Sequence, residues 1–517
     1  MSGAGPSSAG APPLKGAMLA ITALALALGT FTQVLDTTIA NVSLPTIAGN
    51  LGSSTDQGTW IITSFAVANG VSVPLTGWLM NRFGVVRVFV FSLGAFTVAS
   101  FLCGMAWSLP VLIFFRVLQG AVSGPVIPGS QALLISIFPP QRRSTALGIW
   151  SITTLVAPVA GPILGGYISD NFHWGWIFFI NLPIGLFCCV VCWRNLAARE
   201  TATRKLPIDA IGLALLVVWV GALQVMLDTG KNADWFASPV ITIFAITAAV
   251  GCAAWVIWEW TDNHPIVDLS LFRNRNFAFG TLALCLGFGL FFATIIIQSL
   301  WLQVHVSYTA TWAGLVIAPS AMVSVLLTPA CARLLGRVDA RIAATASFLL
   351  LAVSFFMRAG YTDDADYWNL VMPLLVQGMA LSVFMISMMT ICLEGVASRD
   401  IPAASGIANF ARITGSGFAA SLATTFWDRR EALHQSRLAE TPTQFNPLLR
   451  SAIDQLQVHG VSPLRGLGLL TRRMVDQAYL IALNDLFWIA GFACLTMIGL
   501  IWLTRRAISD APVADAG

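Results

Sequence analysis

The first long apolar stretch of the chain reads AMLAITALALALGTFTQVLDTTIA and covers residues 17–40. A bilayer core of about 30 Å needs about 20 apolar residues in one helix, so this stretch is long enough to cross a membrane. Backbone polar groups inside lipid must be satisfied within their own segment, which favours a helix. The stretch contains Asp36 and leads into a second apolar segment. We therefore expect a transmembrane helix and not a cleaved signal peptide.

The composition of the whole chain also indicates a membrane protein. Of its 517 residues, 57% are hydrophobic and only 10% are charged, whereas soluble globular proteins carry about 25% charged residues. So little charge excludes a soluble enzyme, a disordered chain and a nucleic-acid binder. The chain has no P-loop motif, no metal-ligand spacing and no catalytic triad pattern, so we expect a non-enzymatic membrane protein without a metal or cofactor.

The apolar segments predict an all-α polytopic protein with fourteen spans. A membrane β-barrel would instead show alternating runs of about 10 residues. The predicted spans lie at about 17–40, 57–79, 86–107, 109–136, 145–168, 175–193, 209–227, 239–260, 277–302, 311–332, 342–358, 369–393, 403–427 and 480–504.

Two similar basic turns, at residues 79–87 and 333–341, each follow a span and suggest a repeat. They predict two six-span halves, 17–200 and 270–504, with a two-span insert and its linkers at 201–269. Two repeated halves around a midplane site are the usual plan of a secondary transporter. The tails are predicted at 1–16, as a disordered cytoplasmic segment, and at 505–517, also cytoplasmic.

Positive charge in the loops predicts the orientation of the chain. The short loops on one side hold only Lys231 and Arg358, so both termini are expected in the cytoplasm. The loops on the N-terminal side carry Lys15, Arg82, Arg87, Arg142, Arg143, Arg194, Arg199, Arg204, Lys205, Arg273, Arg275, Arg333, Arg337, Arg341, Arg399, Arg505 and Arg506.

The predicted external loop 428–479 is an exception, because it is long and also basic. Within it, Ser462 and Pro463 are expected to start a helix that continues into the last span. The loop is either a cap over the exit or a docking surface for another protein. Apolar side chains at helical spacing, which would form an amphipathic face on protein, are Leu448, Leu449, Ile453 and Leu456, beside Arg450 and Asp454.

Ionisable residues inside spans are costly, so they are the first candidates for function. Asp36 lies three residues after Gln33, on the same helix face, and its affinity for a proton depends on its surroundings. We expect it to carry the coupling proton. The alternative is a cap or turn residue at the membrane interface, since Asn41 and Pro45 follow soon.

Arg116, in the fourth span, is the second candidate for proton coupling. A buried guanidinium needs carboxylate or carbonyl partners, so Arg116 could tune a carboxylate or serve as a structural tie. Arg412 occupies a similar position in the second half. The side chains expected to bind substrate are Gln33, Asn41, Gln119, Asn409 and Arg412.

Small residues and prolines in the fifth span predict a pivot. Gly161 and Gly165 form a ridge that lets another helix approach closely, and Pro162 removes a backbone hydrogen bond. The expected pivot comprises Pro158, Gly161, Pro162, Gly165 and Gly166.

Several of these motifs match one family. The chain resembles the fourteen-span drug:proton antiporters of the major facilitator superfamily. The resemblance rests on LDTTIANVSLP at residues 35–45, Arg116 with Gln119 and Gly120, and GPILGG at 161–166. Further stretches, at 167–181 and 265–272, resemble the inner-membrane pumps of tripartite efflux systems.

The resemblance implies the major facilitator fold and proton-driven export of hydrophobic or amphipathic drugs across the bacterial inner membrane. It also implies a periplasmic adaptor (EmrA-like) and an outer-membrane channel (TolC-like) as partners, beside protons and membrane lipids. A narrow metabolite exporter of the same fold is the alternative. A membrane receptor or scaffold that only docks an adaptor would be a different class of function.

One cytoplasmic loop departs from the family pattern. The family reads G-x-L-a-D-R-x-G-R-K, where this chain has Gly77, Arg82, Gly84 and Arg87 but places Asn81 at the acidic position. We therefore expect a weaker charge-based latch at this loop.

Overall fold

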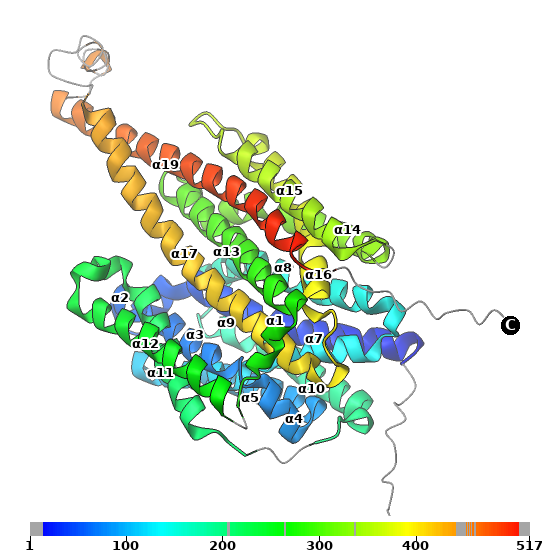
Figure 1. The fold of residues 1–517 in the computed structure, drawn as a ribbon. Coiled ribbons are helices and arrows are strands. Elements are labelled where there is room, and N and C mark those ends of the chain that lie inside the picture. Colours follow the sequence, from blue (N-terminus) through cyan, green and yellow to red (C-terminus); the bar gives the residue numbers. More distant parts are fainter. Residues whose placement is uncertain are drawn as a thin grey trace, which may run out of the picture.

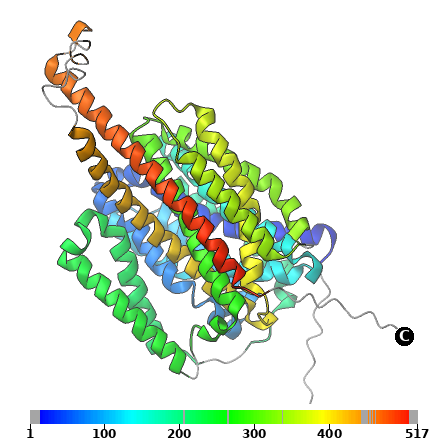
Figure 2. The same cartoon turned by 45° about the horizontal axis from the view of Figure 1, so that its top comes forward.

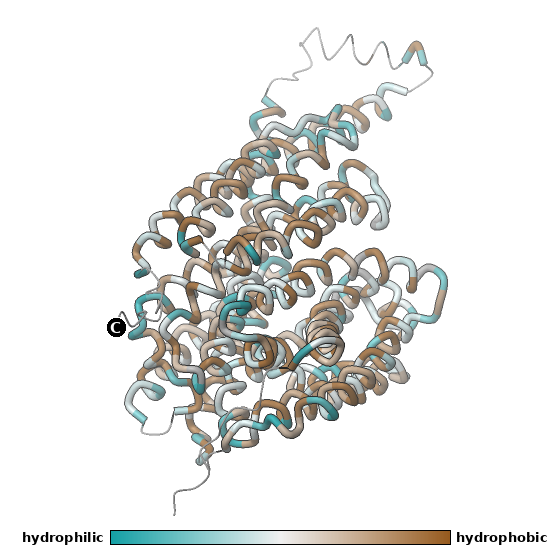
Figure 3. Tube along the Cα trace, turned by 90° about the vertical axis from the view of Figure 1, so that its right-hand side faces the viewer, coloured by the Kyte–Doolittle hydropathy of each residue, from teal (hydrophilic) through white to brown (hydrophobic). Residues whose placement is uncertain are grey.

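The structure is a computed structural model that describes residues 14–203, 207–262, 265–335, 338–440, 451, 453, 455, 457–459 and 462–505. Throughout this part of the chain the regular structure is helical, without strands. Hydrophobic residues follow the lengths of the helices and hydrophilic residues gather at their ends (Figure 3). This is the pattern expected of helices that cross a bilayer.

Six predicted spans form the N-terminal half. They are α1 (Gly16–Asn50), the pair α3 (Trp60–Ser72) and α4 (Thr76–Phe83), α5 (Val85–Gly104), the pair α6 (Leu109–Ser123) and α7 (Val126–Ile137), α8 (Arg143–Asn171), and the pair α9 (Trp176–Phe179) and α10 (Asn181–Leu196). A short helix, α2 (Thr55–Gly58), follows α1. The α3–α4 pair is bent by 55°.

The insert and the C-terminal half supply the remaining spans. The insert consists of α11 (Ala210–Thr229) and α12 (Pro239–Thr261). The C-terminal half consists of α13 (Arg275–Val304), α14 (Ala310–Leu335), α15 (Ala340–Arg358), α16 (Tyr367–Leu393), α17 (Ile401–Ala439) and α19 (Pro463–Trp502).

The helices agree with the predicted fourteen spans. Twelve helices of the described chain are long and apolar enough to cross a membrane, and the bent α3–α4 pair makes a thirteenth span. The fourteenth is α17, whose C-terminal part is polar but which packs along α13 and α19 within the same bundle (Figure 1).

The two halves meet along two lines of contact. α8 packs against α14 and α16, while α7 and α4 pack against α17. The insert lies outside the bundle, where α11 packs against α3 and α17 (Figure 2). Among the twelve long apolar helices of the described chain, α12 is the least buried inside the protein, at 17%, and α16 the most buried, at 72%.

The loop predicted at 428–479 is shorter in the structure, because helices extend into it from both sides. α17 continues to Ala439, and α19 begins at Pro463 with Ser462 as its N-cap. The start of α19 was predicted correctly, but the residues up to Ala439 were wrongly assigned to a loop because they are polar. The two helices project together beyond their neighbours (Figures 1 and 2). Leu448, Leu449, Arg450, Asp454 and Leu456 lie outside the described residues, as do most of the predicted tails 1–16 and 505–517.

The glycines of α8 allow it to lie directly against α1. A Cβ atom added at Gly161 would overlap the Thr38 side chain, and one added at Gly165 would come within 3.0 Å of the Ile39 Cγ1 and carbonyl oxygen atoms. Gly166 is different, because an added Cβ atom there would meet nothing within 4 Å. The close approach therefore depends on Gly161 and Gly165 and not on Gly166.

We predict that Gly165→Leu destabilises the folded protein by roughly 1–3 kcal/mol, the usual cost of overpacking. The matched change Gly166→Leu should leave the thermal unfolding temperature close to that of the wild type. Thermal unfolding of both purified variants measures the difference. Equal unfolding temperatures would show that the α1–α8 contact accommodates a large side chain.

Candidate functional site

Asp36 and Arg116 form an ion pair inside the N-terminal half. The Arg116 NH1 group donates to Asp36 Oδ2 over 2.5 Å, and both residues are fully buried. Asp36 lies well inside α1 and Arg116 inside α6. The interpretation of Asp36 as an interfacial cap or turn residue is therefore wrong, since α1 continues for several turns on either side of it.

Amide side chains complete the hydrogen bonding of the carboxylate. Gln119 Nε2 and Asn181 Nδ2 each donate to Asp36 Oδ1 over 3.0 Å. The same two nitrogens also donate to Ser100 Oγ, over 2.8 and 3.3 Å. Asp36 is thus bonded by residues of α6 and α10, and Ser100 of α5 orients the two amides, which gives the buried charge the hydrogen bonds it requires.

Arg116 has partners besides Asp36. It donates from Nε to the Ile61 carbonyl oxygen over 3.1 Å and from NH1 to Gln119 Oε1 over 2.7 Å. Its guanidinium carbon lies 4.2 Å from the centre of the Phe65 ring, within the range of a cation–π interaction. Arg116 therefore has three partners that do not depend on the charge of Asp36.

The residues predicted to bind substrate do not form one cluster. Gln119 belongs to the Asp36 site. Gln33 is buried on the same helix, and its Oε1 atom has no hydrogen-bond partner in the described chain. Asn41 is exposed further along α1. Asn409 and Arg412 lie apart from all three, on α17.

Asn409 connects the two halves. Its Nδ2 group donates to Gln131 Oε1 of α7 over 3.0 Å, and Arg412 Nε donates to its Oδ1 over 3.2 Å. Arg412 is buried, with its guanidinium carbon 4.6 Å from the Phe288 ring centre. Gln131 Nε2 has no partner among the described residues. Buried polar atoms usually have a hydrogen-bond partner, so the unpartnered amide of Gln131 marks a polar site between the two halves.

Sequence reasoning missed Arg358, which it placed in a short external loop. The side chain is fully buried at the end of α15, where NH1 donates to Gln377 Oε1 over 2.9 Å and NH2 bonds Gln298. Its guanidinium carbon lies 4.1 Å from the centre of the Phe487 ring. The prediction that Arg358 lies in an external loop is wrong. An arginine at the end of a span can also point into the protein when buried amides and aromatic rings bind its guanidinium group.

A signal for this second cluster exists in the sequence. Both α6 and α16 contain a Gln-Gly pair, Gln119 with Gly120 and Gln377 with Gly378. In both halves the glutamine accepts a hydrogen bond from a buried arginine. The C-terminal cluster differs in that no ion pair joins Arg358 to a carboxylate in the described residues. Within the described residues, therefore, only the N-terminal cluster joins its arginine to a carboxylate.

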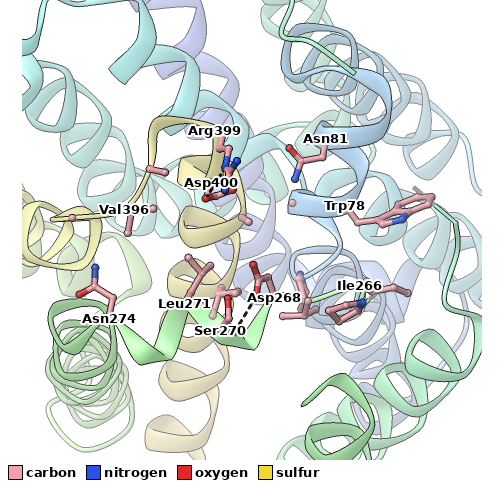
Figure 4. A pocket seen from close by; sticks show the side chains of 18 residues that line it. Trp78, Asn81, Ile266, Asp268, Ser270, Leu271, Asn274, Val396, Arg399 and Asp400 are labelled. Atoms are coloured by element: carbon pink, nitrogen blue, oxygen red, sulfur yellow. Dashed lines mark hydrogen bonds and ion pairs between the residues drawn. The ribbon is translucent and has the colours of Figure 1, made fainter. Parts of the chain in front are cut away.

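The loop motif that was predicted to be cytoplasmic lies where the halves meet. A Cβ atom added at Gly77 would come within 2.7 Å of the Ala403 Cβ atom on α17. Asn81, Arg399 and Asp400 line a shared cavity of about 550 Å³ (Figure 4). The neutral Asn81 thus faces the start of α17, where the family pattern would place a carboxylate.

The rest of the motif shapes the start of α5. Gly84 has φ = 96°, which favours glycine at this turn. Glu200 accepts hydrogen bonds from the backbone amides of Val86 and Arg87, over 3.1 and 2.8 Å. Sequence reasoning missed Glu200. The guanidinium carbon of Arg82 lies 5.3 Å from the centre of the Trp78 ring, within the range of a cation–π interaction.

Comparisons with known proteins identify the family. The model of the Major Facilitator Superfamily matches residues 26–420. The chain is 47% identical to the multidrug export protein EmrB of Escherichia coli K12, over 95% of this chain and 96% of that protein. It is 46% identical to the fatty acid resistance protein FarB of Neisseria gonorrhoeae, over 96% of this chain and 97% of that one.

A solved structure supports the fold. The human organic anion transporter MFSD10 (TETRAN) superposes with a TM-score of 0.59 at 13% identity, covering 93% of this chain and 99% of that one. The predicted family and fold are both confirmed. This chain belongs to the Major Facilitator Superfamily and, within it, to the family of the EmrB multidrug export proteins.

Proposed function

We propose that the protein is a proton-coupled antiporter that exports hydrophobic or amphipathic drugs across the bacterial inner membrane. One observation carries the proton coupling: a fully buried carboxylate, Asp36, is paired with a fully buried arginine inside a span. Such a pair adds little stability compared with apolar packing, so its presence in a membrane helix favours a functional role. The relatives named as multidrug export proteins support the substrate class.

The geometry suggests how one proton changes the site. When Asp36 is ionised, it holds Arg116 and the amides of Gln119 and Asn181. Protonation neutralises the carboxylate and weakens these charge-assisted bonds. Arg116 then keeps the Ile61 carbonyl, the Gln119 oxygen and the Phe65 ring. The cation therefore stays buried while α1 is released from α6.

The α1–α8 contact would carry this change towards the second half. α8 packs on α1 through Gly161 and Gly165 and on α14 and α16 on its other side. We propose that α8 pivots at this ridge, with Pro158 and Pro162 in the same helix. Substrate would bind near the Asn409–Gln131 bond and Arg412, where polar side chains of both halves already meet.

The energy available from protons is sufficient for export. Moving one charge across 100 mV yields about 2.3 kcal/mol, which sustains roughly a fifty-fold gradient of a neutral drug at about 1.4 kcal/mol per tenfold. The proposed orientation places both termini in the cytoplasm, as the loop charges predict. The projecting ends of α17 and α19 would then face the periplasm, where they would meet the adaptor of a tripartite system.

We predict that Asp36→Asn abolishes pH-driven transport of several unrelated dyes in liposomes, because an amide cannot exchange the proton. Asp363→Asn, an exposed carboxylate that only accepts a bond from Gln477, is the matched control. Dye flux after a pH jump is the measurement. Normal flux by well-folded Asp36→Asn would exclude Asp36 as the proton carrier, and flux of a single compound would favour a narrow exporter.

We predict that Arg116→Gln destabilises the protein by about 3–5 kcal/mol, the usual cost of leaving a buried charge unpaired. Adding Asp36→Asn should restore much of that stability, because the remaining groups are then neutral. The double variant should still fail to transport. Thermal unfolding and dye flux of the three variants measure both effects, and a double variant as unstable as Arg116→Gln would disprove the charge argument.

We predict that replacing residues 441–459 by a Gly/Ser linker of equal length leaves liposome transport intact but removes adaptor binding and drug resistance in cells. The replacement keeps α17 and α19 as the structure describes them. Copurification with the adaptor and growth in the presence of drug are the measurements. Loss of liposome transport with adaptor binding unchanged would show instead that the segment caps the transport path.

A further inference from the structure

A second, apolar groove lies between the insert and the C-terminal half, away from the Asp36 site. It has a volume of about 560 Å³ and is lined by α11, α12, the connection between them and α17. Its walls include Trp219, Phe236, Phe418 and Leu422, and the last three are 67%, 43% and 51% exposed. In a bilayer this groove therefore opens sideways to lipid, since the insert lies on the outside of the bundle (Figure 2).

The groove has the depth of one leaflet. Phe418 and Arg429 both line it on α17. Eleven residues separate them, which corresponds to about 16 Å along a helix at 1.5 Å per residue. Half of a bilayer core is about 15 Å. The lining of the groove is thus about as long as one leaflet of the bilayer is deep.

One cation at the end of the groove, Arg429, has no partner among the described residues. The neighbouring Lys231 is neutralised by Asp428, with 2.9 Å between Nζ and Oδ2. Arg429 is exposed and makes no hydrogen bond or ion pair within the described part of the chain. Apolar walls that end at a single unpaired guanidinium are complementary to an acyl chain that carries an anionic head group, because arginine binds phosphate oxygens well.

We propose that this groove binds an anionic phospholipid of the surrounding leaflet, with an acyl chain along Phe418 and Leu422 and the phosphate at Arg429. Polar ties join the insert to α17: Trp235 Nε1 donates to Thr425 Oγ1, Lys231 pairs with Asp428, and Ser421 Oγ donates to the Leu227 carbonyl oxygen over 2.9 Å. Further along α17, the Trp219 and Phe410 rings meet edge to face. α11 therefore touches α17, and the groove lies beside these contacts, between α12 and α17. A bound acyl chain would fill that space and hold the insert against the transport core.

Native mass spectrometry of the full chain with added phosphatidylglycerol tests the proposal. We expect the wild type to retain one lipid tightly. Arg429→Gln should weaken retention about tenfold, the loss of one charge-assisted hydrogen bond. Leu422→Trp should also reduce retention by filling the groove. Leu422 is half exposed, so the larger ring can be accommodated without disturbing the core.

Arg437→Gln is the matched control, because Arg437 is an exposed arginine further along the same helix. It should retain phosphatidylglycerol like the wild type, and phosphatidylcholine should be held more weakly than phosphatidylglycerol by both. Equal retention by wild type, Arg429→Gln and Leu422→Trp would overturn the proposal. So would retention of an added free fatty acid in place of the phospholipid. Neither result depends on whether Asp36 drives transport.

Discussion

The packing of the N-terminal half depends on one ion pair, Asp36 with Arg116, that is buried away from water. Taking two ions out of water costs several kcal/mol each, and only close contact with further hydrogen bonds offsets it. Asp36 and Arg116 meet these requirements with groups from five helices: α1, α3, α5, α6 and α10. Any change in the charge of Asp36 is therefore felt by all five, which is how one proton can act on a whole bundle.

The two halves use related clusters for different purposes. Each has a buried arginine that donates to a glutamine of a Gln-Gly pair, but only the N-terminal arginine faces a carboxylate. The C-terminal cluster uses amides and the Phe487 ring. We infer that the N-terminal half responds to protons and that the C-terminal half, with Asn409 and Arg412 at the interface, responds to the substrate.

The spans and their ionisable residues could be predicted from the sequence because both depend on local composition. Runs of apolar residues mark the helices, and Asp36 and Arg116 stand out within them. Their mutual contact could not be predicted in the same way, since they are 80 residues apart and their pairing depends on how α1 and α6 pack.

The errors have the same origin. Arg358 was assigned to a loop because it ends a span, and only the packing of α13, α16 and α19 around it shows that it points inward. The helical residues 428–439 were missed because they are polar, although they continue α17. Gly166 was grouped with Gly161 and Gly165 because composition does not say which side of a helix meets a neighbour.

We propose that Asp36 itself gains and loses the coupling proton, and infrared difference spectroscopy can detect this change at the carboxyl group. Spectra of the purified protein, recorded as a hydrophobic cationic dye is added, should show a change in the C=O band of a protonated carboxylic acid. We expect this change in the wild type and not in Asp36→Asn. The same change in both proteins would show that another carboxyl group carries the proton.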